Sequence, residues 1–137
     1  MPPYANLVDR YVSDAVETLP PARLVTMLYD GLVRDLSLAE RAIGRADLET
    51  ASGRLVHAQA ILLELRGGLD PSKWSGALQL EQIYLWLINE LVAANVAKDA
   101  ARVAACRGLV EPLRDAWHTA AAQLGAAAPT LAPEPQA

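Results

Sequence analysis

Apolar residues recur every three or four positions along four stretches of the chain, the spacing that places side chains on one face of an α-helix. Prolines and glycines separate these stretches and predict helices over residues 22–45, 48–66, 75–97 and 100–124. The second stretch illustrates the pattern, with core-facing positions at Leu48, Ala51, Leu55, Ala58, Leu62, Leu65 and Leu69. The predicted connections are short, so neighbouring helices should run antiparallel. The pattern predicts an all-α fold, an antiparallel up-and-down four-helix bundle.

The ends of the predicted helices carry residues that commonly start or stop a helix. Asp47 and Asp99 precede the second and fourth helices, where a carboxylate can accept hydrogen bonds from unpaired N–H groups. Gly67 and Gly68 follow the second helix and predict a left-handed turn. Pro112 lies inside the fourth helix, lacks an N–H, and has a ring that crowds the preceding turn. We therefore predict a kink near Pro112 or a break into two shorter helices.

Additional apolar residues lie beside the core-facing stripe of the third helix. The run from Ile83 to Ile88 is apolar throughout and leaves the helix no polar side. Ile88 belongs to a second stripe, whereas Ile83 and Trp86 point away from both stripes. Two interpretations remain open. The helix is packed on several sides within the bundle, or it exposes an apolar groove that binds a partner.

The N-terminal residues form an amphipathic pattern of their own, which ends at Pro20. It predicts either a short fifth helix on the core or a removable lid over a groove. The last residues are rich in Pro and Ala, a composition typical of disordered segments. The predicted organisation is a lid segment over 1–19, a four-helix bundle over 20–124 and a disordered tail over 125–137.

Composition and charge narrow the function classes. The chain has 137 residues, a net charge of −4 with acids and bases interspersed, and one cysteine. Nucleic-acid binding depends on clustered Lys and Arg, so nucleic acid is not an expected partner. No apolar run approaches the length of a membrane span, about 20 residues, so membrane insertion is not expected. A single cysteine forms no internal disulfide and no signal peptide is recognisable, so we predict a cytoplasmic protein.

Candidate chemistry in the chain is sparse. A histidine phosphotransfer domain carries Lys and Gly three and four residues after its histidine, whereas Ala60 and Ile61 follow His57, so this alternative is weakly supported. Asp115 and His118 share one helix face, but a di-iron bundle needs a second such pair and further carboxylates, so we expect a surface ion pair. No Ser/His/Asp set or Gly-rich phosphate loop is recognisable. We predict no enzymatic activity, no catalytic residue, no cofactor and no metal site.

Four segments, in matching order, resemble the flagellar secretion chaperones, which are the export chaperones specific for flagellin. They are LVTMLYDGLVRDLSLAERAI at 24–43, HAQAILLELRGGLD at 57–70, IYLWLINELVAAN at 83–95 and LRDAW at 113–117. The resemblance implies a non-catalytic four-helix bundle that binds the disordered C-terminal segment of flagellin in apolar grooves. It also implies that the loaded chaperone docks on the flagellar export gate. Such binding would block premature polymerisation in the cytosol and keep flagellin exportable.

The resemblance also assigns a role to the N-terminal segment. Tyr11 matches a tyrosine of the family's N-terminal segment, which occupies part of the groove until flagellin displaces it. We therefore expect Tyr4, Leu7, Val8 and Tyr11 to be lid residues. The chain departs from the family at Pro20, where a serine usually precedes the helix-opening proline, so a side-chain cap is lost.

Candidate partner-binding residues come from the second and third helices, where the sequence does not separate groove positions from core positions. They are Leu55, Ala58, Leu62, Ile83, Trp86 and Ile88. The expected partners are the C-terminal segment of flagellin and the flagellar export gate, and the empty protein is expected to be a monomer or a weak dimer. A helical adaptor for another amphipathic helix is the alternative that the sequence leaves open.

Overall fold

The helices of the chain follow one another with short connections. A computed structural model describes the backbone of residues 21–70, 72 and 75–131, and within these ranges the side chains of residues 22–124. This part of the chain forms α2 (Pro21–Gly44), α3 (Leu48–Gly67), α4 (Ala77–Ala97) and α5 (Ala100–Leu131). The predicted helices are confirmed, with starts and ends close to those expected except at the end of α5.

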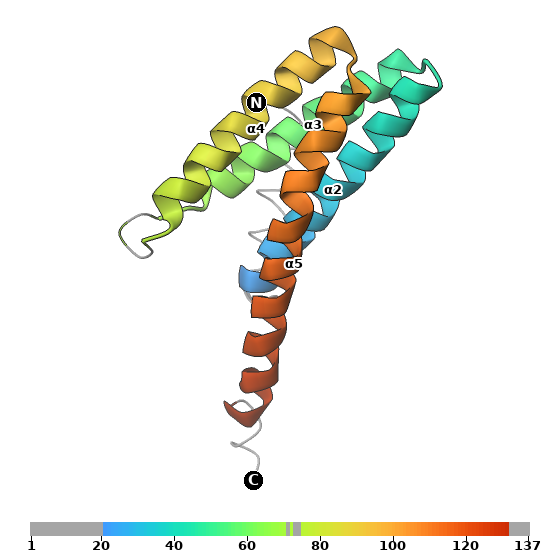
Figure 1. Ribbon diagram of the computed structural model, residues 1–137. Coiled ribbons are helices and arrows are strands. Elements are labelled where there is room, and N and C mark those ends of the chain that lie inside the picture. Colours follow the sequence, from blue (N-terminus) through green and yellow to red (C-terminus); the bar gives the residue numbers. More distant parts are fainter. Residues whose placement is uncertain (1–20, 71, 73–74, 132–137) are drawn as a thin grey trace.

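The four helices pack in an antiparallel bundle (Figure 1). α2 packs most extensively against α3 and α5, and α4 closes the bundle against α3 and α5. The second half of α5 extends past the ends of the other helices at the lower end of the view in Figure 1. The predicted fold class is therefore confirmed, and α2 and α4 lie on different sides of the bundle with α3 and α5 between them.

The core is formed by the residues that share the predicted helix faces. Leu36 of α2, Leu55 and Leu62 of α3, and Leu87 and Leu91 of α4 have no exposed surface. Burial of each such leucine stabilises the fold by about 1.5–3 kcal/mol relative to an exposed position. On α5 the corresponding positions are Val103, Cys106 and Val110, which are also fully buried. The three- and four-residue spacing thus located the core positions of α3, except at its ends, where Leu48 is 49% exposed and Leu69 is only partly buried.

α2 and α3 are joined by a turn in which one aspartate serves both helices. Ala46 has a φ of 60° in the left-handed region. Its N–H donates to the carbonyl of Ile43, while the N–H of Asp47 donates to the carbonyl of Ala42 at 2.8 Å. These two bonds form a Schellman motif, which closes the end of α2. The side chain of Asp47 then accepts a hydrogen bond from the N–H of Thr50, which confirms the predicted cap of α3.

The turn between α4 and α5 repeats this arrangement. Lys98 is left-handed with a φ of 49°, and the N–H of Asp99 donates to the carbonyl of Ala94 at 3.0 Å. Oδ1 of Asp99 accepts from the N–H groups of Ala101 and Arg102 at 3.0 and 3.2 Å. The predicted cap at Asp99 is confirmed, and in both turns the aspartate closes one helix and opens the next.

The predicted left-handed turn at the end of α3 is wrong. Gly68 has a φ of −86° and remains in the right-handed region, and no described glycine has a positive φ. The N–H of Gly68 donates to the carbonyls of Glu64 and Leu65, so the helix ends in right-handed geometry. The left-handed positions are instead the non-glycine residues Ala46 and Lys98, at the two tight turns.

The predicted break in the fourth helix is also wrong, because α5 is one helix from Ala100 to Leu131. Pro112 and Gly108 both lie on the exposed side of α5. A proline there leaves the Gly108 carbonyl without its helical partner, but water can bond to an exposed carbonyl. The helix also runs beyond the expected end at Leu124, so residues 125–131 of the expected tail are helical. Residues 132–137 lie outside the described part of the chain.

Candidate functional site

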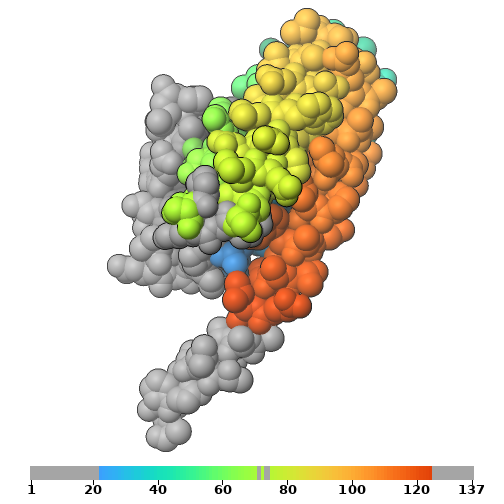
Figure 2. All heavy atoms as spheres, turned by 60° about the vertical axis from the view of Figure 1, so that its left-hand side comes forward, coloured from blue at the N-terminus to red at the C-terminus, as the bar shows by residue number. Residues whose placement is uncertain are grey.

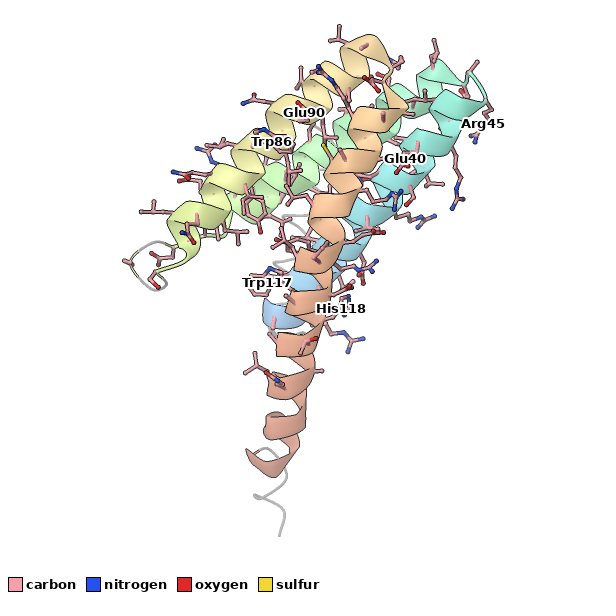
Figure 3. All side chains as sticks on the ribbon, viewed as in Figure 1. Glu40, Arg45, Trp86, Glu90, Trp117 and His118 are labelled. Atoms are coloured by element: carbon pink, nitrogen blue, oxygen red, sulfur yellow. The ribbon has the colours of Figure 1, made fainter. Side chains whose placement is uncertain are left out.

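Three of the segments quoted above meet at a buried aromatic cluster. Tyr29 of α2 lies between Tyr84 of α4 and Trp117 of α5, with ring centroids 6.4 and 6.3 Å apart. The hydroxyl groups of Tyr29 and Tyr84 form a hydrogen bond, and both side chains are buried. Figure 3 shows Trp117 projecting from α5 toward α2. This cluster ties three helices together in the centre of the bundle.

Burial holds the hydroxyls of Tyr29 and Tyr84 and the thiol of Cys106 in their neutral forms. Loss of solvation raises the pKa of Tyr29 against the opposing effect of its hydrogen bonds. Loss of solvation also raises the pKa of Tyr84, and the hydrogen bond to Tyr29 adds to this shift. Burial, followed by the nearby charge of Glu90, raises the pKa of Cys106 to about 11. The core thiol is therefore protonated at neutral pH and a poor nucleophile, as expected of a cysteine that fills the core.

The two residues that follow Tyr29 contact α5 and α3. Oδ1 of Asp30 lies 2.7 Å from Nε2 of His118 on α5, which is hydrogen-bond distance. A Cβ atom added at Gly31 would lie 3.3 Å from Cδ1 of Ile61, so glycine permits α3 to approach closely at this point. Tyr29, Asp30 and Gly31 together contact α3, α4 and α5. The inward-facing residues of the Met-Leu-Tyr-Asp-Gly sequence therefore form a packing centre, whereas Met27 is exposed.

A second polar contact joins α2 to α3. The carboxylate of Asp35 is almost fully buried, and Nη1 of Arg54 donates to its Oδ1 at 3.3 Å. Nδ1 of His57 contacts the other oxygen, Oδ2. Both partners come from α3 and remain partly exposed, so the pair bridges the buried acid to the surface. Burial of an unpaired carboxylate costs much free energy, and the contacts with Arg54 and His57 offset this cost for Asp35.

Exposed apolar residues gather on the side of the bundle formed by α4 and its two neighbours. We call this surface the apolar face, and each large residue in it is between 38% and 58% exposed. Its members are Val56 and Leu63 of α3, Leu78, Leu85, Trp86 and Val92 of α4, and Leu109 of α5. Figure 2 turns this side forward and shows the surface of α4 (yellow) beside that of α5 (orange). Exposed apolar side chains gathered on neighbouring helices of a single domain indicate a binding site.

A hollow between α4 and α5 lies within the apolar face. It is lined by Gln79, Gln82, Ile83 and Trp86 from α4 and by Leu109 from α5. In Figure 3, Trp86 stands on the outer side of α4. Apolar side chains flanked by amides can accept an apolar anchor and still hydrogen-bond the backbone around it.

Charge is almost absent from α4. Among residues 77–97 the ionisable side chains are Glu81 and Glu90. Glu81 accepts a hydrogen bond from Nε of Arg66 on α3 at 3.2 Å, and Glu90 lies 3.9 Å from Nε of Arg102 on α5. Both acids are thus paired with arginines of the neighbouring helices, and the other side chains of α4 are apolar, amide or Tyr84. A partner that binds there meets little unpaired charge to desolvate.

The candidate partner-binding residues occupy two different environments. Leu55, Ala58 and Leu62 have no exposed surface and lie in the core cluster, so a partner cannot reach them in the closed bundle. Ile83 and Ile88 are half-buried against that core, and Trp86 is 50% exposed.

Sequence reasoning placed Leu85 and Val92 in a stripe beside the core but did not include them among candidate binding residues. The exposed positions Leu63 of α3 and Leu109 of α5 were likewise not included. Leu63 and Leu109 are exposed because of how α3 and α5 are rotated about their axes relative to α4. The helical period of a sequence does not determine this rotation. The candidate lid residues Tyr4, Leu7, Val8 and Tyr11 lie outside the described residues.

Comparison with known proteins identifies the family. Residues 4–124 match the family model described as "Flagellar protein FliS". The chain belongs to the FliS family. A flagellar secretion chaperone FliS from Bacillus subtilis is 34% identical over 115 residues, covering 84% of this chain and 86% of the relative. The corresponding protein of Salmonella typhimurium is 31% identical over 108 residues, covering 77% and 80%.

Membership of the FliS family accounts for the absence of catalytic features. These proteins are chaperones rather than enzymes, as predicted, and three of the quoted segments supply much of the buried core of the bundle. No helix in the described part of the chain is long and apolar enough to cross a membrane.

Each histidine of this FliS family member contacts a carboxylate. His57 is bound to Asp35, and His118 is bound to Asp30 rather than to Asp115 as predicted. Asp115 pairs instead with the neighbouring Arg114 at 3.1 Å, because His118 points to α2. The described residues contain no group of three His, Cys, Asp or Glu side chains placed to hold a metal ion.

Proposed function

We propose that the chain is a cytosolic chaperone that binds the disordered C-terminal segment of flagellin on the apolar face. Membership of the FliS family and the exposed, uncharged side of α4 support this assignment. The observation that carries it is the set of exposed apolar side chains on α3, α4 and α5, because the fold itself gains nothing from leaving them in water. The amphipathic helices of a polymerising subunit need such a surface.

In the proposed mechanism, flagellin folds against the chaperone as helices with apolar anchors three and four residues apart. Ordering a disordered segment costs about 2–5 kcal/mol or more, and the burial of apolar surface must offset this cost. At about 25 cal/mol per Å², an apolar contact of several hundred Å² is sufficient. The bound segment is then unable to pack against other flagellin subunits, which prevents premature polymerisation.

The test is calorimetric titration of the chain with the C-terminal segment of its cognate flagellin. We expect a one-to-one complex, and we expect Trp86→Glu or Leu85→Glu to weaken binding at least tenfold. Each substitution places a charge in the uncharged surface that the partner must cover. A chain that shows no complex at micromolar concentration is not a flagellin chaperone. If it instead binds another amphipathic helix through Trp86, the helical adaptor is the better description.

Leu48→Glu is the matched control for these variants. Leu48 is 49% exposed, almost the same as Trp86, but it lies in the first turn of α3, and a glutamate there is favoured by the helix dipole. The control changes one exposed apolar residue to the same acid outside the apolar face. Equal loss of binding in Leu48→Glu and Trp86→Glu would show that net charge, rather than the apolar face, determines affinity.

We further propose that residues 4–19 act as a displaceable lid and that the loaded chaperone docks on the flagellar export gate. A lid that must leave first reduces apparent affinity and shields the empty surface, which favours a monomer or weak dimer. Removal of residues 1–19 should therefore tighten flagellin binding or promote self-association, measured by titration and sedimentation. A truncated chain that changes in neither respect has no lid.

A further inference from the structure

Ion pairing is uneven among the arginines of the described residues. Six of them form ion pairs: Arg45, Arg54, Arg66, Arg102, Arg107 and Arg114. Arg107 is the most firmly held, with Nε and Nη2 both donating to the carboxylate of Glu40. This bidentate contact is the main cause of the raised pKa of Arg107. In a chain of net charge −4, acids are in excess and arginines readily find partners.

The three described arginines that form no ion pair with the described residues are Arg23, Arg34 and Arg41. All three are exposed and all three belong to α2. They stand eleven and seven positions apart, close to three and two helical turns, so they align along one side of the helix. The rise per residue separates them by about 16 and 10 Å. We call this line the arginine face.

The arginine face gains little from contacts within α2. Arg23 lies in the first turn, where the helix dipole disfavours a cation. Arg41 lies in the last turn, where the dipole favours it, but it stands four residues before Arg45, and like charges at this spacing repel. Asp30 stands four residues before Arg34, a spacing that favours an acid–base pair, but its carboxylate contacts His118 on α5 and forms no ion pair with Arg34. None of the three arginines is held by an acid of the described residues, which points to a role outside the chain.

The remaining residues on this side of α2 suit a protein partner. Met27 lies between Arg23 and Asp30 and is 43% exposed. Arg and Met are both enriched at protein interfaces relative to other surfaces. Asp30 is the acid on this line, and its carboxylate contacts His118. Figure 3 shows Arg45, next to the end of α2, on the side of the bundle away from Trp86.

We propose that the arginine face binds an acidic helix of a protein partner, whose carboxylates recur at intervals of about two and three turns. Three well-separated guanidinium groups in line match a straight helix that carries Asp or Glu at the same intervals. An anionic membrane or a nucleic acid is less well matched, because both rely on dense clusters of cations and the chain as a whole is acidic. This site is separate from the apolar face and goes beyond the proposed binding of flagellin.

The test uses two synthetic, fluorescently labelled helical peptides of the same composition. One carries glutamates at positions i, i+7 and i+18, and the other carries them on different sides of the helix. We expect the matched peptide to bind the full chain about tenfold more tightly than the shifted one, as three exposed ion pairs allow. The doubly reversed variant with Arg34→Glu and Arg41→Glu should lose this preference. It should still bind the C-terminal segment of flagellin.

Arg102→Glu, combined with Lys98→Glu, is the matched control, since it gives the same net charge at exposed or half-buried positions outside the arginine face. Melting temperatures of both variants establish that they are folded. Equal affinity for the two peptides, no binding of either, or the same loss in both double variants would overturn the proposal. The proposal would also be overturned if the chain bound phosphatidylserine vesicles more tightly than the matched peptide and the Arg34→Glu and Arg41→Glu variant lost this vesicle binding.

Discussion

The outer sides of α4 and α2 differ in almost every surface property, although both helices rest on the same core. α4 carries two acids among residues 77–97, each turned to a neighbouring helix, and exposes leucine, valine and tryptophan. α2 exposes arginines that no described acid pairs with. An apolar surface gains affinity from burial, whereas an exposed charged surface gains mainly specificity and rate of association. The two sides are therefore suited to different partners.

The difference also separates a role in folding from a role in binding. Tyr29 and Asp35 lie on the inner side of α2 and hold it to the other helices. The arginines on its outer side make no such contacts. A substitution on the inner side should alter both surfaces together, and one on the outer side should alter a single surface. The expected outcomes below test this division, from the largest effect to the smallest.

Removal of the ring at the centre of the bundle should disturb both surfaces at once. Tyr29→Ala leaves a cavity between α2, α4 and α5 and deprives the Tyr84 hydroxyl of its partner. We expect the free energy of unfolding to fall by about 3–5 kcal/mol, measured by urea denaturation. Met27→Ala, on the exposed side of the same helix, should cost about 1 kcal/mol or less. Similar losses in the two variants would contradict the assignment of Tyr29 to the core.

Loss of the buried carboxylate should loosen α2 from α3. Asp35→Ala leaves Arg54 and His57 without their acid, and we expect the free energy of unfolding to fall by about 1–3 kcal/mol. Because both partners are partly exposed, water can replace the acid, and the loss should stay below that at Tyr29. Asp30→Ala, at an exposed ion pair, is the control and should cost about 1 kcal/mol or less.

Salt should separate the two surfaces. Exposed ion pairs weaken as the Debye length falls from about 10 Å at 0.1 M to about 3 Å at 1 M. The preference for the matched acidic peptide should therefore vanish over this range. Binding of the flagellin segment to the apolar face should change by no more than about twofold, because apolar burial is not screened. Titrations at 0.1 M and 1 M salt measure the affinity for the acidic peptide and the affinity for the flagellin segment. If salt changed the two affinities equally, the distinction between the faces would be lost.

The turns offer changes that should leave both surfaces unaltered. Ala46 and Lys98 adopt left-handed backbone conformations that cost non-glycine residues about 1–2 kcal/mol. Ala46→Gly or Lys98→Gly relieves this cost but adds freedom to the unfolded chain, so each should raise the free energy of unfolding by about 0.5–1 kcal/mol. Ala101→Gly, in the helical first turn of α5, should be destabilising in the same denaturation experiment.

The smallest effect concerns acid stability. The hydrogen bonds from Thr50, with a smaller effect of Arg45, lower the pKa of Asp47 below its usual value of 3.8. A lowered folded-state pKa contributes stability above the unfolded value and loses it as pH falls through the folded value. Asp47→Asn keeps a capping group that does not titrate. Between pH 5 and pH 2 the melting temperature of Asp47→Asn should therefore fall slightly less than that of the unaltered chain.

The fold was predictable because helix spacing and caps are local properties. Asp47 and Asp99 were found as caps, and Ala51 and Leu65 as core positions, from their neighbours in sequence alone. The left-handed turn at Gly68 and the break at Pro112 were wrong, because each residue permits a local feature without requiring it.

The candidate site was less predictable, because it depends on how the helices are turned toward one another. Leu55 and Leu62 were candidates for partner binding and are fully buried, whereas Leu63 is 52% exposed. One residue along a helix changes direction by about 100°, and only the positions of α2 and α4 decide which direction is core. The unpaired state of Arg23, Arg34 and Arg41 likewise depends on the positions of acids on other helices.

The buried cluster around Tyr29 has a consequence for engineering. The segment around Tyr29, by which the family is most easily recognised, packs the helices against one another. Similarity in that segment therefore indicates a shared fold and does not indicate which protein is bound. The exposed residues of α4 can then be exchanged for those of another family member while Tyr29, Gly31 and Tyr84 are kept. Such a graft would test whether binding specificity can be transferred between chaperones by exchanging surface residues alone, with the core left unchanged.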